Sequence, residues 1–134
     1  MNELISSISP TTNISILSTN DIYIDKMIYR YLGNSGIKVS VLSYGNSKGS
    51  YNAETEQEII ECVKECFDHG VNFFDTAEIY GQGEAEKVLG KAIKELNVPR
   101  SELVISTKFG SCGRGINDKM LSRKHLTDAI FASL

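Results

Sequence analysis

Apolar residues recur in short runs between turn residues from about Met27 onward. These runs predict strands over residues 29–32, 37–40, 41–44, 71–74 and 103–107. The first two flank Gly33-Asn34-Ser35-Gly36, whose composition favours a tight turn, so we expect them to pair as a hairpin. The third is expected to end at Gly45.

Three segments are predicted to be helices, and the first two have the apolar spacing of an amphipathic helix. The first is predicted over residues 55–69, because a capping-box sequence opens it and Gly70 can end it. The second is predicted over residues 84–97 and is stopped by Pro99, and the third begins at Ser122. The apolar faces of the first two comprise Ile59, Val63, Cys66 and Phe67, and Ala85, Leu89, Ala92, Ile93 and Leu96.

Strands that alternate with helices imply a parallel sheet, so the predicted fold class is α/β. An open doubly wound sheet and a closed eight-fold barrel are the competing architectures. A dinucleotide-binding open sheet would carry G-x-G-x-x-G directly after its first parallel strand, whereas polar sequence follows Gly45. We therefore expect the N-terminal portion of a TIM (β/α)8 barrel, a hairpin plus about three βα units. The barrel would be incomplete in this chain, because a whole one needs about 250 residues.

Composition bounds the domains, the partners and the location. Residues 1–26 show no sustained period, so we expect a disordered N-terminal extension before a domain over residues 27–134. The net charge is −3 without a basic cluster, which argues against nucleic acid as a partner. No apolar run approaches the roughly 18 residues of a membrane span, and the N-terminus lacks the pattern of a signal peptide. With 3 cysteines read as reduced thiols, we expect a cytoplasmic protein without direct membrane insertion.

Polar residues stand where two of the predicted strands end, the place where barrels carry their chemistry. Asp75 and Lys108 follow successive strands, and Tyr80 lies in the same loop as Asp75. A free tyrosine keeps its proton up to about pH 10, and a cation beside it favours the phenolate. Lys108 would thus make Tyr80 a better general acid, while Asp75 orients Lys108 by an ion pair. Spacing alone leaves a structural alternative open, in which these side chains cap a loop, meet solvent and pack.

Cys62, Cys66 and His69 are four and three residues apart, as metal ligands on one helix face would be. Cys66 also lies on the apolar face with Val63 and Phe67, where cysteine behaves as a small hydrophobe. A closed zinc site needs a fourth ligand, and none is indicated. We therefore expect no metal site.

Several distinctive segments occur in a fixed order. They are Arg30-Tyr31-Leu32-Gly33, Ser35-Gly36, Asp75-Thr76-Ala77-Glu78-Ile79-Tyr80-Gly81, Gly83-Glu84-Ala85-Glu86, Val88-Leu89-Gly90, Val104-Ile105-Ser106-Thr107-Lys108 and Leu121-Ser122-Arg123-Lys124-His125. In this order they resemble the aldo-keto reductase superfamily. Within it, the resemblance is greatest to the branch of the voltage-gated potassium channel β subunits and their relatives.

The resemblance implies a (β/α)8 barrel that binds NADP(H) and reduces aldehydes or ketones by hydride transfer. It assigns Asp75, Tyr80 and Lys108 to a catalytic tetrad of Asp, Tyr, Lys and His, the last being Asn in the channel subunits. The fourth residue would end the next strand, so neither His69 nor His125 corresponds to it. It also implies that Asn46, Ser47 and Asp75 contact the cofactor. The aromatic residue usual in the loop after the first strand is absent from Gly45-Asn46-Ser47.

Two functions and an inactive fragment remain open at this point. The first is a reductase that acts on a small carbonyl substrate. The second is a binding protein similar to the channel β subunits, which senses redox state and docks on a membrane channel or forms a homo-oligomer. The residue that would discriminate them lies beyond Leu134.

Overall fold

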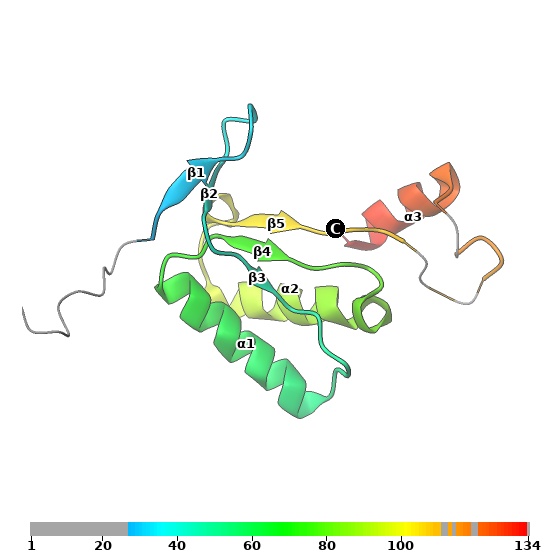
Figure 1. The fold of residues 1–134 in the computed structure, drawn as a ribbon. Coiled ribbons are helices and arrows are strands. Elements are labelled where there is room, and N and C mark those ends of the chain that lie inside the picture. Colours follow the sequence, from blue (N-terminus) through cyan, green and yellow to red (C-terminus); the bar gives the residue numbers. More distant parts are fainter. Residues whose placement is uncertain (1–26, 111–112, 114, 119–120, 134) are drawn as a thin grey trace, which may run out of the picture.

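The structure, a computed structural model, describes residues 27–110, 113, 115–118 and 121–133 (Figure 1). The prediction for residues 1–26 lies outside this part of the chain. Its elements are β1 (Tyr29–Tyr31), β2 (Lys38–Ser40), β3 (Tyr44–Gly45), α1 (Ala53–Asp68), β4 (Phe73–Asp75), the 3-10 turn η1 (Tyr80–Gly83), α2 (Glu84–Leu96), the 3-10 turn η2 (Arg100–Glu102), β5 (Val104–Ser106) and α3 (Arg123–Ser133). This order confirms a hairpin followed by three βα units.

The predicted hairpin is present, with β1 and β2 antiparallel and Tyr29 opposite Ser40. It is tied to the amino end of β4. The Tyr29 hydroxyl donates to the Gly70 carbonyl at 2.7 Å, and Asn72 Nδ2 donates to the Lys38 carbonyl at 3.0 Å. The Ser40 amide in turn donates to Asn72 Oδ1 at 2.7 Å. The hairpin therefore covers the end of the sheet opposite to the one where the strands finish.

The remaining strands form a parallel sheet in the order β3-β4-β5. The prediction of a strand over residues 41–44 is wrong in its position, because β3 is Tyr44–Gly45. The Val41 amide donates to the Ile28 carbonyl at 2.9 Å, so this segment still belongs to the hairpin. Val41 and Leu42 are 51% and 63% exposed, which shows that their apolar side chains do not join the core.

β4 also starts later than the predicted residue 71. The Val71 amide donates to the Cys66 carbonyl at 2.9 Å, and Gly70 has a φ of 86°, so these residues complete the end of α1. At its other end, β4 extends to Asp75, one residue beyond the predicted segment. Asp75 is therefore part of the strand rather than of the loop after it.

α1 begins at Ala53, two residues before the predicted start at Thr55. Asn52 is its N-cap, and its side-chain oxygen accepts from the Thr55 amide at 2.8 Å. Thr55 is thus inside the first turn, and the predicted start there is wrong. Glu54 and Glu56 lie in the first turn, where the positive end of the helix dipole favours their negative charge.

The core lies between α1, α2 and one face of the parallel sheet, and Figure 1 shows the two helices on the same side of the strands. Phe74 is fully buried and meets Tyr44 edge to face, with ring centroids 6.5 Å apart. The helices contribute Ile59, Ile60 and Val63, and Val88, Leu89 and Ala92. Since neighbouring residues of a strand point to opposite faces, Phe73 and Asp75 lie on the face away from these helices.

Candidate active site

Asp75 lies on the face of the sheet away from α1 and α2, at the carboxyl end of β4. The parallel register places Ser106 of β5 directly beside it. The Ser106 hydroxyl donates to Asp75 Oδ1, which fixes one oxygen of the carboxylate. On the other side, Gly45 of β3 pairs with Asp75 and adds no side chain to this face. The second carboxylate oxygen, Oδ2, accepts a hydrogen bond from another residue.

That residue is Lys108, which follows β5. Its Nζ donates to Asp75 Oδ2 at 2.6 Å and to the Thr76 carbonyl at 2.6 Å. The side chains of Lys108 and Asp75 are 50% and 34% exposed, so the pair sits at the surface of the strand ends and is accessible to a ligand. Two fixed acceptors hold one ammonium group in place.

Tyr80 is the third member of the cluster. Lys108 Nζ lies 5.2 Å from the centroid of the Tyr80 ring, within the range of a cation–π contact. The Tyr80 amide donates to the Ala77 carbonyl at 3.0 Å, which starts the turn η1. The structure therefore brings together Asp75, Tyr80 and Lys108, as the sequence predicts. The structural alternative in which Lys108 is merely solvated does not describe this geometry.

The ion pair shifts the acid-base behaviour of both its members. Partial burial by itself would raise the pKa of Asp75, but hydrogen bonds from Lys108 and Ser106 and the charge of Lys108 outweigh it. The pKa of Asp75 is therefore lowered. Burial by itself would lower the pKa of Lys108, but the hydrogen bond and charge of Asp75 outweigh it, and Tyr80 contributes in the same direction. The pKa of Lys108 is raised, so the ammonium is the stable form.

The Tyr51 ring packs against the turn that carries Tyr80. Gly81 has a φ of 60°, a left-handed conformation that costs glycine little, and a Cβ there would collide with the Tyr51 ring. The Tyr51 hydroxyl donates to the Asn46 carbonyl at 2.7 Å. The loop after β3 and the loop after β4 are thereby locked to each other through one aromatic side chain.

Asn46 and Ser47 occupy different environments. Asn46 is fully buried, and its Nδ2 donates to the Ala85 carbonyl at 2.7 Å, so its side chain joins the loop after β3 to α2. Its amide lies 3.4 Å from the Asp75 carbonyl oxygen. Ser47 is exposed. Of the two residues, Ser47 is the one that an incoming ligand can reach directly.

Sequence reasoning did not identify the contact between Glu78 and His125. Glu78 Oε2 and His125 Nε2 are 3.0 Å apart, and the two side chains are only 16% and 6% exposed. A partly buried glutamate of the loop after β4 thus contacts a buried histidine of α3. The sequence held a signal, since both residues belong to the distinctive segments, but 47 positions separate them.

The cysteine and histidine positions on α1 do not converge. His69 Nδ1 lies 2.9 Å from the Glu65 carbonyl oxygen and is also near the Glu65 carboxylate. Cys62 is exposed, whereas Cys66 is half-buried and packs against the core. Within the described residues, no group of three or more His, Cys, Asp or Glu side chains is arranged to hold a metal ion.

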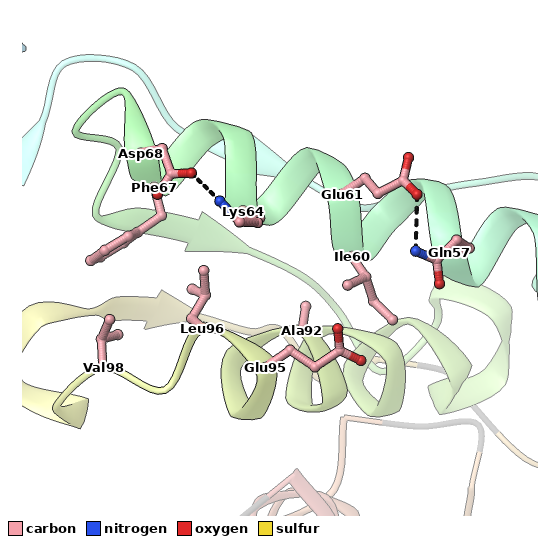
Figure 2. A pocket seen from close by; sticks show the side chains of 10 residues that line it. All are labelled: Gln57, Ile60, Glu61, Lys64, Phe67, Asp68, Ala92, Glu95, Leu96 and Val98. Carbon is pink, nitrogen blue, oxygen red and sulfur yellow. Dashed lines mark hydrogen bonds and ion pairs between the residues drawn. The ribbon is translucent and has the colours of Figure 1, made fainter.

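A hollow of about 450 Å³ lies between α1 and α2, on the opposite side of the sheet from Asp75 (Figure 2). Lys64 pairs with Asp68 along its rim, and Gln57 Nε2 donates to Glu61 at 2.9 Å. The other lining residues are Ile60, Phe67, Ala92, Glu95, Leu96 and Val98. Because it lies on the helix side of the sheet, this hollow is separate from the cluster at the strand ends.

The aldo/keto reductase family model matches residues 41–134 of this chain. The chain belongs to this family. The matched segment contains Asp75, Tyr80 and Lys108, together with the Glu78 and His125 pair. None of the helices in the described part of the chain combines the length and the apolar character needed to cross a membrane.

Relatives and solved structures extend this result. A protein of Arabidopsis thaliana named as a probable voltage-gated potassium channel subunit beta is 49% identical over 111 residues, which cover 81% of this chain and 33% of that protein. A protein of the same name from Oryza sativa subsp. japonica is 45% identical over 108 residues, with 81% and 33% covered. The chain thus spans about a third of the length of these curated relatives.

Among solved structures, an aldo-keto reductase of Bacillus halodurans in its holo form is similar with a TM-score of 0.66 and 30% identity. The alignment covers 81% of this chain and 36% of that one. A thermostable aldo-keto reductase solved with the inhibitor epalrestat has a TM-score of 0.65 and 28% identity, with 81% and 38% covered. The chain therefore has the fold of the N-terminal part of the aldo-keto reductase barrel.

Proposed function

We propose that this chain forms the proton-donating part of the active site of an NADP(H)-dependent aldo-keto reductase, which reduces a small aldehyde or ketone. The observation that carries the proposal is the position of the Lys108 ammonium, bound to the Asp75 carboxylate and placed over the ring of Tyr80. Membership of the aldo/keto reductase family supports it.

Tyr80 is the general acid in this proposal. Its phenol gives a proton to the carbonyl oxygen as negative charge develops there. The ammonium of Lys108 stabilises the phenolate that remains, and its raised pKa keeps it charged at neutral pH. Asp75 acts through Lys108, because its carboxylate holds the ammonium at one place instead of leaving it to solvent.

The strand ends fit a nicotinamide cofactor in two respects. Ser47 is exposed in the loop after β3, and the Asp75 carboxylate is partly exposed at the end of β4, so both offer polar atoms that a ligand can reach. Gly45 leaves the face beside Asp75 free of a side chain.

In this proposal, the residues of this chain that contact the cofactor are Asn46, Ser47 and Asp75. NADPH supplies the hydride when it is bound. This chain's residues bind the polar groups of the cofactor at the strand ends and hold the general acid, Tyr80, beside it.

The experiment places residues 27–134 in a whole barrel. A chimera is made by replacing the matching segment of the Bacillus halodurans reductase, and NADPH oxidation with a simple aromatic aldehyde is followed by absorbance. We expect NADPH- and aldehyde-dependent turnover that Lys108→Met reduces by about 10²-fold or more. A chimera that unfolds cooperatively, binds NADPH and loses no rate on this substitution would contradict the proposal.

A second candidate function rests on the plant relatives, which are named as channel subunits at 45% and 49% identity. In this candidate, the same site binds NADP(H) and senses its redox state, while the surface docks on a membrane channel or on further copies of the chain. Slow carbonyl reduction by the chimera, together with binding of the chain to a purified potassium channel, would favour it over a metabolic reductase.

A further inference from the structure

Glu78 and His125 form a buried contact between the loop after β4 and the first turn of α3. Glu78 Oε2 lies 3.0 Å from His125 Nε2, and little of either side chain is exposed. An imidazole that carries its proton on Nε2 donates to a carboxylate in this geometry. The contact joins α3 to the loop that bears Tyr80.

The same carboxylate oxygen also holds the segment that follows Lys108. The Gly110 amide donates to Glu78 Oε2 at 3.0 Å, and the Glu78 amide donates to the Lys108 carbonyl at 2.9 Å. Glu78 therefore binds the backbone on both sides of Phe109. Tyr80 lies two residues beyond Glu78, so one residue links the segments of the proposed acid and of its cation.

His125 is fixed in its turn by the start of α3. The Ser122 hydroxyl accepts from the His125 amide at 3.0 Å, and the Ser122 carbonyl accepts from the Leu126 amide at 2.9 Å. Arg123 and Lys124 of the same turn are exposed, whereas His125 is buried. The one polar side chain that this turn buries is the one that meets Glu78.

We propose that Glu78 and His125 are a positioning pair, which fixes the backbone of Lys108 and Tyr80 so that the ammonium stays on Asp75. The pair would act on the reaction only through those residues, and in that sense the inference rests on the proposed function. The structural part of the proposal does not depend on the reaction, because the contact between Lys108 and Asp75 can be probed without any substrate.

The test measures the titration midpoint of the Asp75 carboxyl carbon by NMR in the full chain. In Glu78→Ala, we expect this midpoint to rise, since Lys108 is held less closely and its hydrogen bond is what lowers the pKa of Asp75. The Gly110 amide should exchange with solvent about tenfold faster or more, because its acceptor is gone. His125→Ala should also raise the titration midpoint of Asp75.

The controls separate positioning from a loss of stability. Glu78→Gln keeps an oxygen that can accept from Gly110 and should restore the wild-type midpoint in large part. Glu95→Ala and His69→Ala remove exposed residues of the same types and should leave it unchanged. A merely structural pair would lower the unfolding temperature in Glu78→Ala and leave the Asp75 midpoint of the folded protein where it was. That result would overturn the proposal.

A measurement on the unsubstituted chain covers the case in which Glu78→Ala does not fold. A long-range proton–nitrogen NMR spectrum reports which imidazole nitrogen of His125 carries the proton. We expect a proton on Nε2, and a neutral ring protonated only on Nδ1 would overturn the proposal. Because none of these readouts involves carbonyl reduction, an inactive chimera with an intact pair would refute the proposed function alone.

Discussion

Lys108 Nζ lies 2.6 Å from Asp75 Oδ2, although 33 positions of sequence separate the two residues. The parallel register of β4 and β5 brings them together, because Asp75 pairs with Ser106 and Lys108 follows two residues later. The same ammonium lies over the ring of Tyr80. A carboxylate, an ammonium and a phenol from two successive βα units thus meet at one end of the sheet.

The first prediction concerns the acid-base coupling in this pair. In Lys108→Met, the pKa of Asp75 should rise, because the hydrogen bond and charge that lower it are removed while the partial burial that raises it remains. NMR titration of the carboxyl carbon measures this directly. Lys64→Met breaks the exposed pair with Asp68 and serves as the control, with no expected effect on Asp75.

The pH dependence of stability follows from the same shifts. The lowered pKa of Asp75 means that its contribution is present above the ordinary carboxyl value of about 3.9 and is lost as pH falls through the lowered value. The raised pKa of Lys108 means that its contribution is lost only as pH rises past about 10.4. Asp75→Asn should therefore reduce stability slightly at pH 7 and hardly at all near pH 2. An equal loss at both pH values would argue against the ion pair.

The second prediction concerns the turn after Tyr80. Gly81→Ala should destabilise the chain by about 1–3 kcal/mol, because alanine is strained at this positive φ and its Cβ meets the Tyr51 ring. Gly90→Ala is the matched control, since Gly90 lies inside α2 and a Cβ there would meet open space. This substitution should stabilise the chain by about 0.5–1 kcal/mol. Urea unfolding of both variants measures the difference, and two changes of the same sign would refute this description of the turn.

The third prediction concerns the core beneath the site. Phe74→Ala should cost about 3–5 kcal/mol, because the ring is fully buried between the sheet and the helices. Phe131→Ala removes a side chain that is 74% exposed and should change stability by less than about 0.5 kcal/mol. The denaturant midpoints of Phe74→Ala and Phe131→Ala measure the two losses of stability. Similar midpoints would mean that Phe74 is not the centre of the core.

The sequence predicts the hairpin, the helices and their buried faces because those features depend on local spacing. Ile59, Val63, Ala85, Leu89 and Ala92 are all buried as their periodicity indicates. Strand boundaries are harder to predict, because they depend on which residues find a partner in the neighbouring strand. The segment from Val41 pairs back with the hairpin instead, and no local pattern marks that choice.

The site was predictable in part. The general rule for barrels and the resemblance of the segment around Tyr80 identified Asp75, Tyr80 and Lys108, and the structure brings these side chains together. The contact between Glu78 and His125 was not predicted, because a contact between residues 47 positions apart depends on how α3 packs. The burial of Asn46 against the Ala85 carbonyl likewise depends on the packing of α2.

The fourth prediction tests the central claim, that Tyr80 supplies the proton. Tyr80→Phe in the chimera should lower kcat by about 10²–10⁴-fold and leave the dissociation constant of NADPH near its original value, because the hydroxyl acts on the transition state. Tyr29→Phe, at the opposite end of the sheet, is the control and should leave the rate unchanged. The decisive measurement is kcat of the Tyr80→Phe chimera with NADPH and the aldehyde both saturating. The predicted result is the loss of rate, and turnover equal to that of the unsubstituted chimera would contradict the assignment of Tyr80 as the acid.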